Sequence, residues 1–245
     1  MGSVVVTGGT SGIGLGIATA LVAAGRDVAV LARDPGRGEL AAQALDEAGS
    51  GRGLVLPADV TDESALARAV ATVAAELGPP EGLVTAAGRL ARGSALELPV
   101  EDFRAAWETN VLGTWLAVRA VLPGMLERGF GRIVTIGSVL GTVGTAERGG
   151  YAATKGAVHA LTRCIALEVA GTGVTVNCVA PGPIGTPMNQ VQGDEEVQQA
   201  LTAKLPVRRW GTPADVSAAV LPLLAEGSAF VTGSVVHVDG GYTAQ

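Results

Sequence analysis

The chain has 245 residues, of which 48% are hydrophobic and 16% charged, so it can bury a large core and does not have the composition of a disordered protein. Its formal charge of −6, with no lysine-rich stretch, argues against nucleic acid and anionic membrane surfaces as partners. The two cysteines and two histidines are well separated, so neither a disulfide framework nor a metal site is predicted. With no signal-like start and no long apolar run, we expect a cytoplasmic protein.

Short apolar runs rich in β-branched residues alternate with longer helical patterns along the chain. This alternation is typical of a parallel sheet covered by helices on both faces, and no linker or repeat divides it. The sequence therefore predicts one doubly wound α/β domain of about seven strands over residues 1–245. The expected strands are Ser3–Thr7, Asp27–Ala32, Gly53–Pro57, Gly82–Ala86, Arg132–Ser138, Val174–Ala180 and Ser234–Val238, and the expected helices lie near 12–24, 37–48, 62–77, 100–127, 150–171 and 213–225.

The first expected strand runs directly into a glycine-rich turn, Thr7-Gly-Gly-Thr-Ser-Gly-Ile-Gly14. Gly8, Gly12 and Gly14 have the spacing GxxxGxG, one residue wider than the usual GxGxxG. Backbone amides of such a turn, together with the dipole of the helix that follows, can hold a pyrophosphate. The place of this turn, after the first strand of an α/β chain, predicts dinucleotide binding.

A tyrosine and a lysine, Tyr151 and Lys155, lie four residues apart in the helix expected near 150–171, so they share one face. An ammonium about 5 Å from a phenol, at an effective dielectric near 20, stabilises the phenolate by roughly 3 kcal/mol, or about two pKa units. The spacing therefore predicts an acid–base tyrosine, although an isolated YxxxK is more often a surface feature. Ser138 ends an expected strand thirteen residues upstream, where parallel sheets bind ligands, and its hydroxyl could orient a carbonyl.

A Ser–His–Asp hydrolase is the alternative that Ser138 raises. No G-x-S-x-G elbow surrounds this serine and no histidine is close to it in sequence. We therefore expect His159 and His237 to be structural and do not predict a hydrolase.

Several motifs together resemble the short-chain dehydrogenases/reductases in order and spacing, over essentially the whole chain. They are TGGTSGIG at 7–14, Asp59-Val60, Ala-Ala-Gly at 86–88, Asn110, Ser138, YAATK at 151–155 and Pro181-Gly182. The resemblance implies a Rossmann-type fold that binds a nicotinamide cofactor. Thr85-Ala-Ala-Gly88 lacks both asparagines of the family's Asn-Asn-Ala-Gly, although Thr85 could bond to neighbouring backbone, so we expect altered stabilisation of the sheet rather than lost cofactor binding.

The resemblance also assigns cofactor contacts. It implies that Asp59 accepts the adenine amino group beside Val60, and that Ile184 and Thr186 contact the nicotinamide carboxamide. The other expected contacts are Gly8, Thr10, Ser11, Gly12, Ile13, Gly14, Ala87, Gly88, Tyr151, Lys155, Pro181 and Gly182.

Two residues after the second strand indicate different cofactors. Counting about twenty residues from Gly14 reaches Asp34, which could bind a ribose 2′-hydroxyl and would indicate NAD(H). In the strand register, the position where NAD-dependent members of the family carry their acid holds Ala32, and Arg33 follows. An arginine there can grip a 2′-phosphate with its planar fork, and Arg37 could assist. We therefore predict NADP(H) rather than NAD(H).

The resemblance gives the catalytic roles to Asn110, Ser138, Tyr151 and Lys155. It implies that Tyr151 donates a proton during ketone reduction and Ser138 holds the carbonyl oxygen. Lys155 lowers the pKa of Tyr151 and binds the nicotinamide ribose, and Asn110 supports a water relay. A non-catalytic NADP-binding sensor is the hypothesis from another class, and the complete set of four residues counts against it.

The substrate is expected to be a small-molecule or acyl-thioester ketone. The segment 125–138 resembles 3-oxoacyl-carrier-protein reductases and polyketide ketoreductases, with small alcohols, quinones and sugar acids as alternatives. Carrier-protein reductases have basic docking residues where this chain has Gly129 and Thr172, although Arg128 and Arg132 are nearby, so dependence on a carrier protein stays open. The resemblance implies a substrate lid over about 187–208 and a homodimer or homotetramer.

Overall fold

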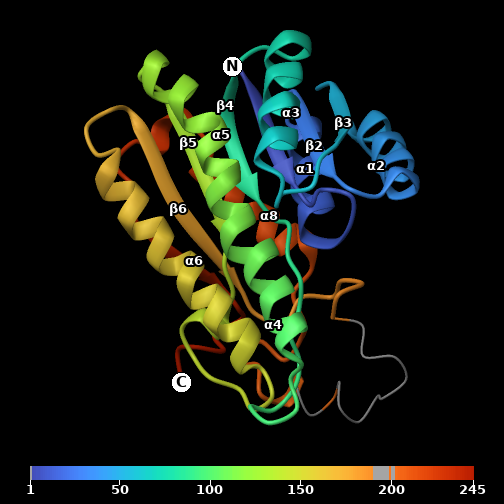
Figure 1. Cartoon of the computed structure of the whole chain (residues 1–245), viewed down its shortest axis with the longest axis vertical. Coiled ribbons are helices and arrows are strands. Elements are labelled where there is room, and N and C mark those ends of the chain that lie inside the picture. Colours follow the sequence, from blue (N-terminus) through green and yellow to red (C-terminus); the bar gives the residue numbers. More distant parts are fainter. Residues whose placement is uncertain (1, 190–198, 200–201) are drawn as a thin grey trace.

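The computed structural model describes residues 2–189, 199 and 202–245, and these form a seven-stranded parallel sheet with the strand order β3-β2-β1-β4-β5-β6-β7 (Figure 1). The predicted doubly wound fold is thereby confirmed. The strands are β1 (Ser3–Thr7), β2 (Val28–Ala32), β3 (Gly53–Pro57), β4 (Pro80–Thr85), β5 (Gly131–Ile136), β6 (Val174–Pro181) and β7 (Val235–Val238). The order reverses direction between β1 and β4, so the crevice in which such sheets bind ligands lies at the carboxyl ends of these two strands.

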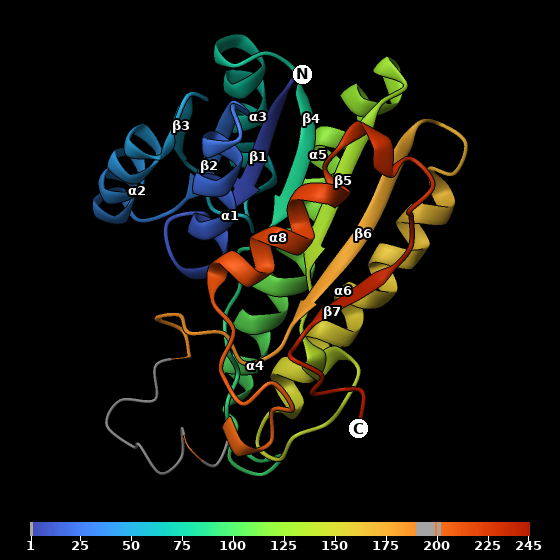
Figure 2. The ribbon, with the colours of Figure 1, turned by 180° about the vertical axis from the view of Figure 1, so that it is seen from behind.

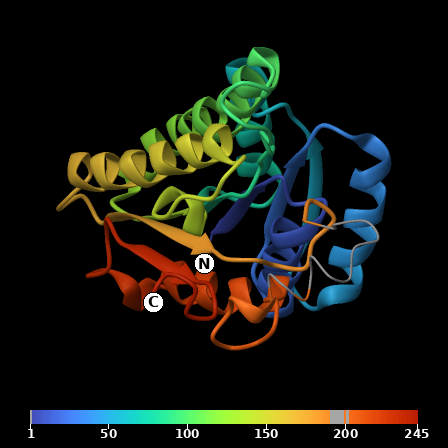
Figure 3. The same cartoon turned by 90° about the horizontal axis from the view of Figure 1, so that it is seen from below.

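Helices cover both faces of the sheet, as Figures 2 and 3 show. On one face, α3 (Glu63–Glu76), α5 (Gly113–Arg128) and α6 (Gly149–Glu168) bury a core that includes Leu116, Met125 and Ile165. On the other, α1 (Gly12–Ala23), α2 (Pro35–Ala48) and α8 (Pro213–Leu223) bury a second core that includes Ile17, Leu21 and Val220. The continuous apolar strands between them are buried on both sides, which explains why their sequences do not alternate.

The helix predicted over 100–127 is interrupted. It consists of α4 (Val100–Trp107), a π-helical turn at Glu108–Leu112 and α5, which ends at Gly129 in a left-handed conformation with φ of 65°. The π turn holds one extra residue in the helical path, a feature that often marks functional sites. Asn110 lies in this turn, where its carbonyl accepts a hydrogen bond of 2.7 Å from the Thr114 hydroxyl.

Thr85 does not form the backbone hydrogen bond that it could have formed. Its hydroxyl is buried at the end of β4 and has no hydrogen-bond partner among the described residues. Because the flanking strands already occupy the backbone groups here, the threonine fills the space without replacing the bonds of the missing asparagines.

Candidate active site

The glycine-rich turn after β1 lies against the segments that follow β4 and β6. Gly8 has φ of +67°, and a Cβ there would lie 2.5 Å from Cα of Ala87, so no side chain fits. Gly12 has φ of +54° and would place a Cβ 3.3 Å from Thr186. A Cβ on Gly14 would collide with the Gly8 carbonyl oxygen. The chain thus brings together predicted contacts from 7–14, 86–88 and 181–186.

The same turn has the chemistry of an anion site. Ser11 is the N-cap of α1 but its side chain makes no capping hydrogen bond, and the first turn of α1 carries no acidic residue. Half-buried Thr10, Ser11 and Ile13 complete the turn. The first N–H groups of a helix and its dipole favour negative charge, so these residues fit a pyrophosphate.

Arg33 and Asp59 follow β2 and β3 and contact each other. Arg33 Nη1 lies 3.5 Å from Asp59 Oδ2, and the arginine side chain is 68% exposed. Asp59 Oδ1 accepts hydrogen bonds from the Thr61 N–H (2.9 Å) and hydroxyl (2.8 Å). Burial alone would raise the pKa of Asp59, but the bonds from Thr61 and the charge of Arg33 hold that pKa below its usual value. Val60 beside it is buried against Gly113.

Asp34 is occupied in a helix cap. Its carboxylate accepts from the Arg37 N–H at 3.1 Å as the N-cap of α2, and Arg37 Nε lies 3.6 Å from the same side chain. Arg37 therefore pairs with Asp34 and does not join Arg33.

Ser138, Tyr151 and Lys155 come together beyond the carboxyl end of β5. Ser138 accepts a hydrogen bond of 3.2 Å from the Leu140 N–H, and its hydroxyl lies close enough to the Tyr151 phenol to oppose the rise in the pKa of that phenol. Lys155 Nζ donates to the Ile136 carbonyl at 2.8 Å and lies 5.6 Å from the centre of the Tyr151 ring. These three side chains occupy one small volume, as expected from their spacing.

The pKa of Tyr151 beside Lys155 differs from the expectation. Burial raises the pKa of Tyr151 to about 12, although the hydrogen bond from Ser138 opposes this, and burial lowers the pKa of Lys155 to about 8. The shift of the tyrosine is opposite in sign to the predicted one. The spacing argument counted the attraction between the two charges but not the loss of hydration that each charge suffers when both are buried.

Asn110 is fixed by the chain around it. Its Oδ1 accepts from the Arg89 N–H at 2.7 Å, and its Nδ2 donates to the Arg89 carbonyl and to the Thr154 hydroxyl, both at 2.9 Å. Thr154 in turn donates to the Tyr151 carbonyl at 2.7 Å. A Cβ on Gly88 would lie 3.6 Å from Asn110 Oδ1 and 4.0 Å from Lys155 Nζ, so both groups border the space beside Gly88. Sequence reasoning missed Thr154, although its place between Tyr151 and Lys155 could have indicated it.

The segment after β6 carries the last predicted contacts. Pro181 ends the strand, and the Gly182 N–H donates to the Val238 carbonyl at 3.0 Å. The Ile184 side chain belongs to the core beside α8, so only its backbone faces the site, whereas Thr186 reaches the glycine-rich turn. Half of the expected lid over 187–208, namely residues 190–198 and 200–201, lies outside the described residues.

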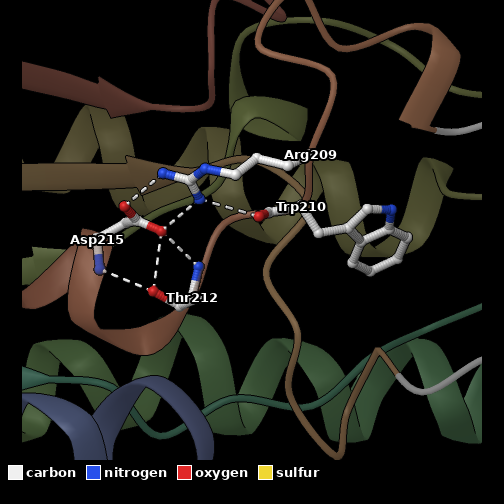
Figure 4. A network of polar contacts seen from close by, with 4 residues as sticks. All are labelled: Arg209, Trp210, Thr212 and Asp215. Atoms are coloured by element: carbon white, nitrogen blue, oxygen red, sulfur yellow. Dashed lines mark hydrogen bonds and ion pairs between the residues drawn. The ribbon is translucent and has the colours of Figure 1, made fainter.

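The chain that leads from residue 202 into α8 is held by the network in Figure 4. Arg209 donates to both carboxylate oxygens of Asp215 at 2.8 and 2.9 Å, and to the Trp210 carbonyl at 3.0 Å. Thr212 and Asp215 form a capping box at the start of α8. The bond from Arg209, with those from Thr212, holds the pKa of Asp215 well below its usual range. A bidentate pair joined to a cap fixes this segment beside Ile184, which pairs with Gly211.

Both histidines border the loop that follows β5. His159 is buried on α6, and burial lowers its pKa to about 4, whereas His237 is exposed and lies 3.0 Å from the Thr142 hydroxyl. Among residues 2–189, 199 and 202–245, no cluster of three potential metal ligands occurs. Within the same residues, no helix has the length and hydropathy required to cross a membrane.

Comparison with known proteins gives matches over nearly the whole chain. Residues 8–243 match the family described as "Enoyl-(Acyl carrier protein) reductase". The "Inactive 2-(S)-hydroxypropyl-CoM dehydrogenase 2" of Xanthobacter autotrophicus is 44% identical over 93% of this chain and 100% of its own length. The "3-oxoacyl-[acyl-carrier-protein] reductase MabA" of Mycobacterium tuberculosis is 38% identical over 98% of this chain and 92% of its own. A crystal structure of actinorhodin polyketide ketoreductase with NADPH superimposes with a TM-score of 0.94 at 36% identity, covering 100% of this chain and 98% of the other.

Proposed function

Since the chain belongs to the short-chain dehydrogenase/reductase family of nicotinamide-dependent oxidoreductases, we propose that it reduces a ketone to a secondary alcohol with NADP(H). The observation that carries the proposal is the convergence of Ser138, Tyr151 and Lys155 beside the glycine-rich turn, with Asn110 held behind them. The whole chain then acts as one cofactor-binding domain, with a substrate lid over about 187–208.

The nicotinamide ring supplies the hydride when the cofactor is bound, and the chain handles the oxygen and the proton. The Ser138 hydroxyl donates a hydrogen bond to the substrate carbonyl oxygen and so favours the negative charge that develops there. The Tyr151 phenol gives its proton to the same oxygen. A pKa of about 12 keeps that phenol protonated at neutral pH, which suits a proton donor in the direction of reduction.

Lys155 stabilises the tyrosinate that remains after this transfer. With a pKa of about 8, the Lys155 ammonium is still mostly charged at neutral pH. It lies near the Tyr151 ring and beside Gly88. Asn110 acts as a positioning residue, because its bond to Thr154 reaches the turn of α6 that carries Tyr151. We retain for Lys155 and Asn110 the expected roles at the nicotinamide ribose and in the proton relay.

The preference for NADP(H) rests on Arg33. Its contact with Asp59 is long and exposed, and such ion pairs contribute only about 0–1 kcal/mol, so the guanidinium can turn to a 2′-phosphate at little cost. Asp34 instead caps α2 and is held by Arg37. The Asp59 carboxylate, Val60, Ile184 and Thr186 would complete the cofactor site.

Replacing Arg33 by alanine should raise the KM for NADPH by roughly 10- to 100-fold, the value of a lost charge-assisted bond, and leave the KM for NADH within about twofold. Steady-state kinetics with both cofactors measure this. Arg37→Ala is the matched control, because that guanidinium lies in the α2 cap, and its effect on NADPH should be small. Equal changes for NADPH and NADH in Arg33→Ala would instead favour NAD(H) and Asp34.

The substrate proposed first is a 3-oxoacyl thioester or a polyketide-derived ketone, which the names of MabA and of the ketoreductase support. Docking of a carrier protein through Arg128 and Arg132 has little support. Arg132 is buried and donates to the carbonyls of Gly131, Gly173, Ala225 and Glu226, and Arg128 donates to the Pro80 carbonyl. A second candidate is a small free secondary alcohol or its ketone, favoured by the relatives named as hydroxypropyl-CoM dehydrogenases.

Loss of NADPH absorbance with β-ketoacyl thioesters, quinones and small ketones tests the proposal directly. Turnover of at least one class is the expected result. Tight NADPH binding without turnover of any of them would favour a non-catalytic sensor. The Xanthobacter relative that is itself named inactive is the reason to test for this outcome.

A further inference from the structure

A buried imidazole packs against the loop that carries Ser138. His159 lies on α6 one helical turn after Lys155, and it is 4% exposed. A Cβ on Gly137 would collide with Nε2 of this ring, and a Cβ on Gly141 would lie 2.5 Å from its Cε1. Because Gly137 directly precedes Ser138 and Gly141 follows it by three residues, the ring contacts the loop on both sides of the serine.

The loop itself is a single short turn. Ser138 is followed by a 3₁₀ turn at Val139–Gly141, and it accepts the Leu140 N–H at its hydroxyl (3.2 Å) and the Gly141 N–H at its carbonyl (2.9 Å). Short 3₁₀ pieces have poor hydrogen-bond geometry, and a single turn has little stability of its own. The groups that the loop packs against therefore determine where the Ser138 hydroxyl lies.

The second histidine holds the same loop from β7. His237 Nε2 lies 3.0 Å from the hydroxyl of Thr142, the residue directly after the 3₁₀ turn. This contact is exposed, so it competes with hydrogen bonds to water and stabilises the loop only weakly. The contact with His159 is buried, and a close-packed interior leaves the loop no room to shift into the space that the ring fills. His159 is therefore the stronger of the two supports.

The two glycines show that the loop is fitted to this ring. Neither Gly137 nor Gly141 has a positive φ, so the backbone conformation does not by itself require glycine at either position. The space that a side chain would need is instead occupied. At Gly137 it is filled by His159 Nε2 and by Cys178 Sγ, 2.7 Å from the Cβ position, and at Gly141 by three atoms of the imidazole. The ring and the two glycines therefore form one contact.

The imidazole supports the loop as a neutral group. Its Nε2 is buried without a hydrogen-bond partner among the described residues. Burial, followed by the charges of His237, Arg163 and Lys155, lowers the pKa of His159 to about 4. The ring therefore adds no positive charge beside Lys155 at neutral pH. An unpaired buried polar atom costs stability that an apolar side chain would not lose, which argues for a role beyond filling the core.

We infer that His159 is a positioning residue for ketone reduction: its imidazole holds the loop 137–142 so that the Ser138 hydroxyl points to the substrate carbonyl beside Tyr151. The inference rests on the ketone-reducing function proposed above. Because the ring contacts the residues around Ser138, it acts on the chemical step through that hydroxyl. A misplacement of about 1 Å can cost about 10²-fold in rate, so the support of this loop has a large kinetic effect.

A double-mutant cycle tests this role. His159→Ala should lower kcat by roughly 10- to 100-fold and leave the KM for NADPH within about twofold, because the loop shifts while the glycine-rich turn stays in place. In the Ser138→Ala background, whose kcat is already about 10²–10³-fold lower, the same replacement should cost less than about threefold, because the hydroxyl that it positions is gone. Ile165→Ala is the matched control. It opens a cavity at another buried position of α6, in the core shared with α5, and should change kcat by less than about threefold.

Hydrogen exchange keeps this test separate from that of the proposed function. The Leu140 and Gly141 amides should exchange about 10-fold faster or more in His159→Ala, and within about threefold of the wild-type rate in Ile165→Ala. Gly141→Ala disturbs the same contact from the loop, since its methyl group displaces the ring, and should reproduce the loss of kcat. If no ketone is reduced but this exchange pattern holds, the ketone-reducing function fails and the support of the loop by His159 stands. Equal losses of kcat with and without the Ser138 hydroxyl, equal exchange in His159→Ala and wild type, or an equal loss in Ile165→Ala would overturn the inference.

Discussion

Replacing Tyr151 by phenylalanine should lower kcat for ketone reduction by about 10²–10⁴-fold, the range that a positioned acid contributes. The phenylalanine ring keeps the packing of a half-buried side chain, and only the hydroxyl that donates the proton is lost. NADPH affinity, measured by fluorescence titration, should change by less than about threefold, because the glycine-rich turn is untouched.

Thr154→Val is the informative companion to that variant. It removes the hydroxyl that links Asn110 to the turn of Tyr151 but leaves the phenol in place. Its loss of kcat should be smaller than that of Tyr151→Phe. Full activity in Tyr151→Phe would contradict the proposed mechanism, whatever the result for Thr154→Val.

Replacing Lys155 by methionine should separate activity from stability. We expect kcat to fall by about 10²–10⁴-fold, because the tyrosinate then has no buried cation beside it. The free energy of unfolding at neutral pH should change little. Removing the ammonium leaves the Ile136 carbonyl without its donor, at a cost of about 1–3 kcal/mol, but it also removes a buried charge whose desolvation is of similar size.

The pH dependence of stability provides a second readout of Lys155. Its pKa in the folded chain is about 8, below the ordinary 10.5, so between these values the unfolded chain binds more protons and the stability of the wild type rises with pH. Between pH 7 and 10 this contribution is of order 2 kcal/mol. Urea denaturation over that range should show the rise in wild type and not in Lys155→Met. Above pH 10 the raised pKa of Tyr151 acts in the opposite direction, since the unfolded phenol ionises first. A parallel pH dependence of both proteins would show that Lys155 is not the buried charge proposed here.

The fold could be predicted because its signals are local. Each strand is an unbroken apolar run between turn residues, and the six helical patterns have the length of a crossover, so strand positions agree with the sequence to within one or two residues at most ends. The strand order was not predicted and comes from the structure. The prediction of one helix over 100–127 missed the π turn at 108–112.

The site was predictable in its members but not in its energetics. Spacing brought Tyr151 and Lys155 together, and motif order added Ser138 and Asn110. The sign of the pKa shift of Tyr151 depends on how deeply Tyr151 and Lys155 are buried. The spacing of two residues in a sequence does not give their burial. Thr154 was missed for a related reason, because its partner Asn110 lies 44 positions away in the sequence.

The π turn also restricts where the chain can lose a residue without disturbing the site. Deleting one residue between 108 and 112 would restore an uninterrupted α-helix, but it would rotate everything upstream by about 100° relative to α5. The stacked rings of Phe103 and Trp107, 6.4 Å apart, would turn to another side of the molecule, and Asn110 would leave Arg89 and Thr154. Surface loops elsewhere can gain or lose residues freely. This turn cannot, because the number of its residues sets the orientation of α4 relative to α5.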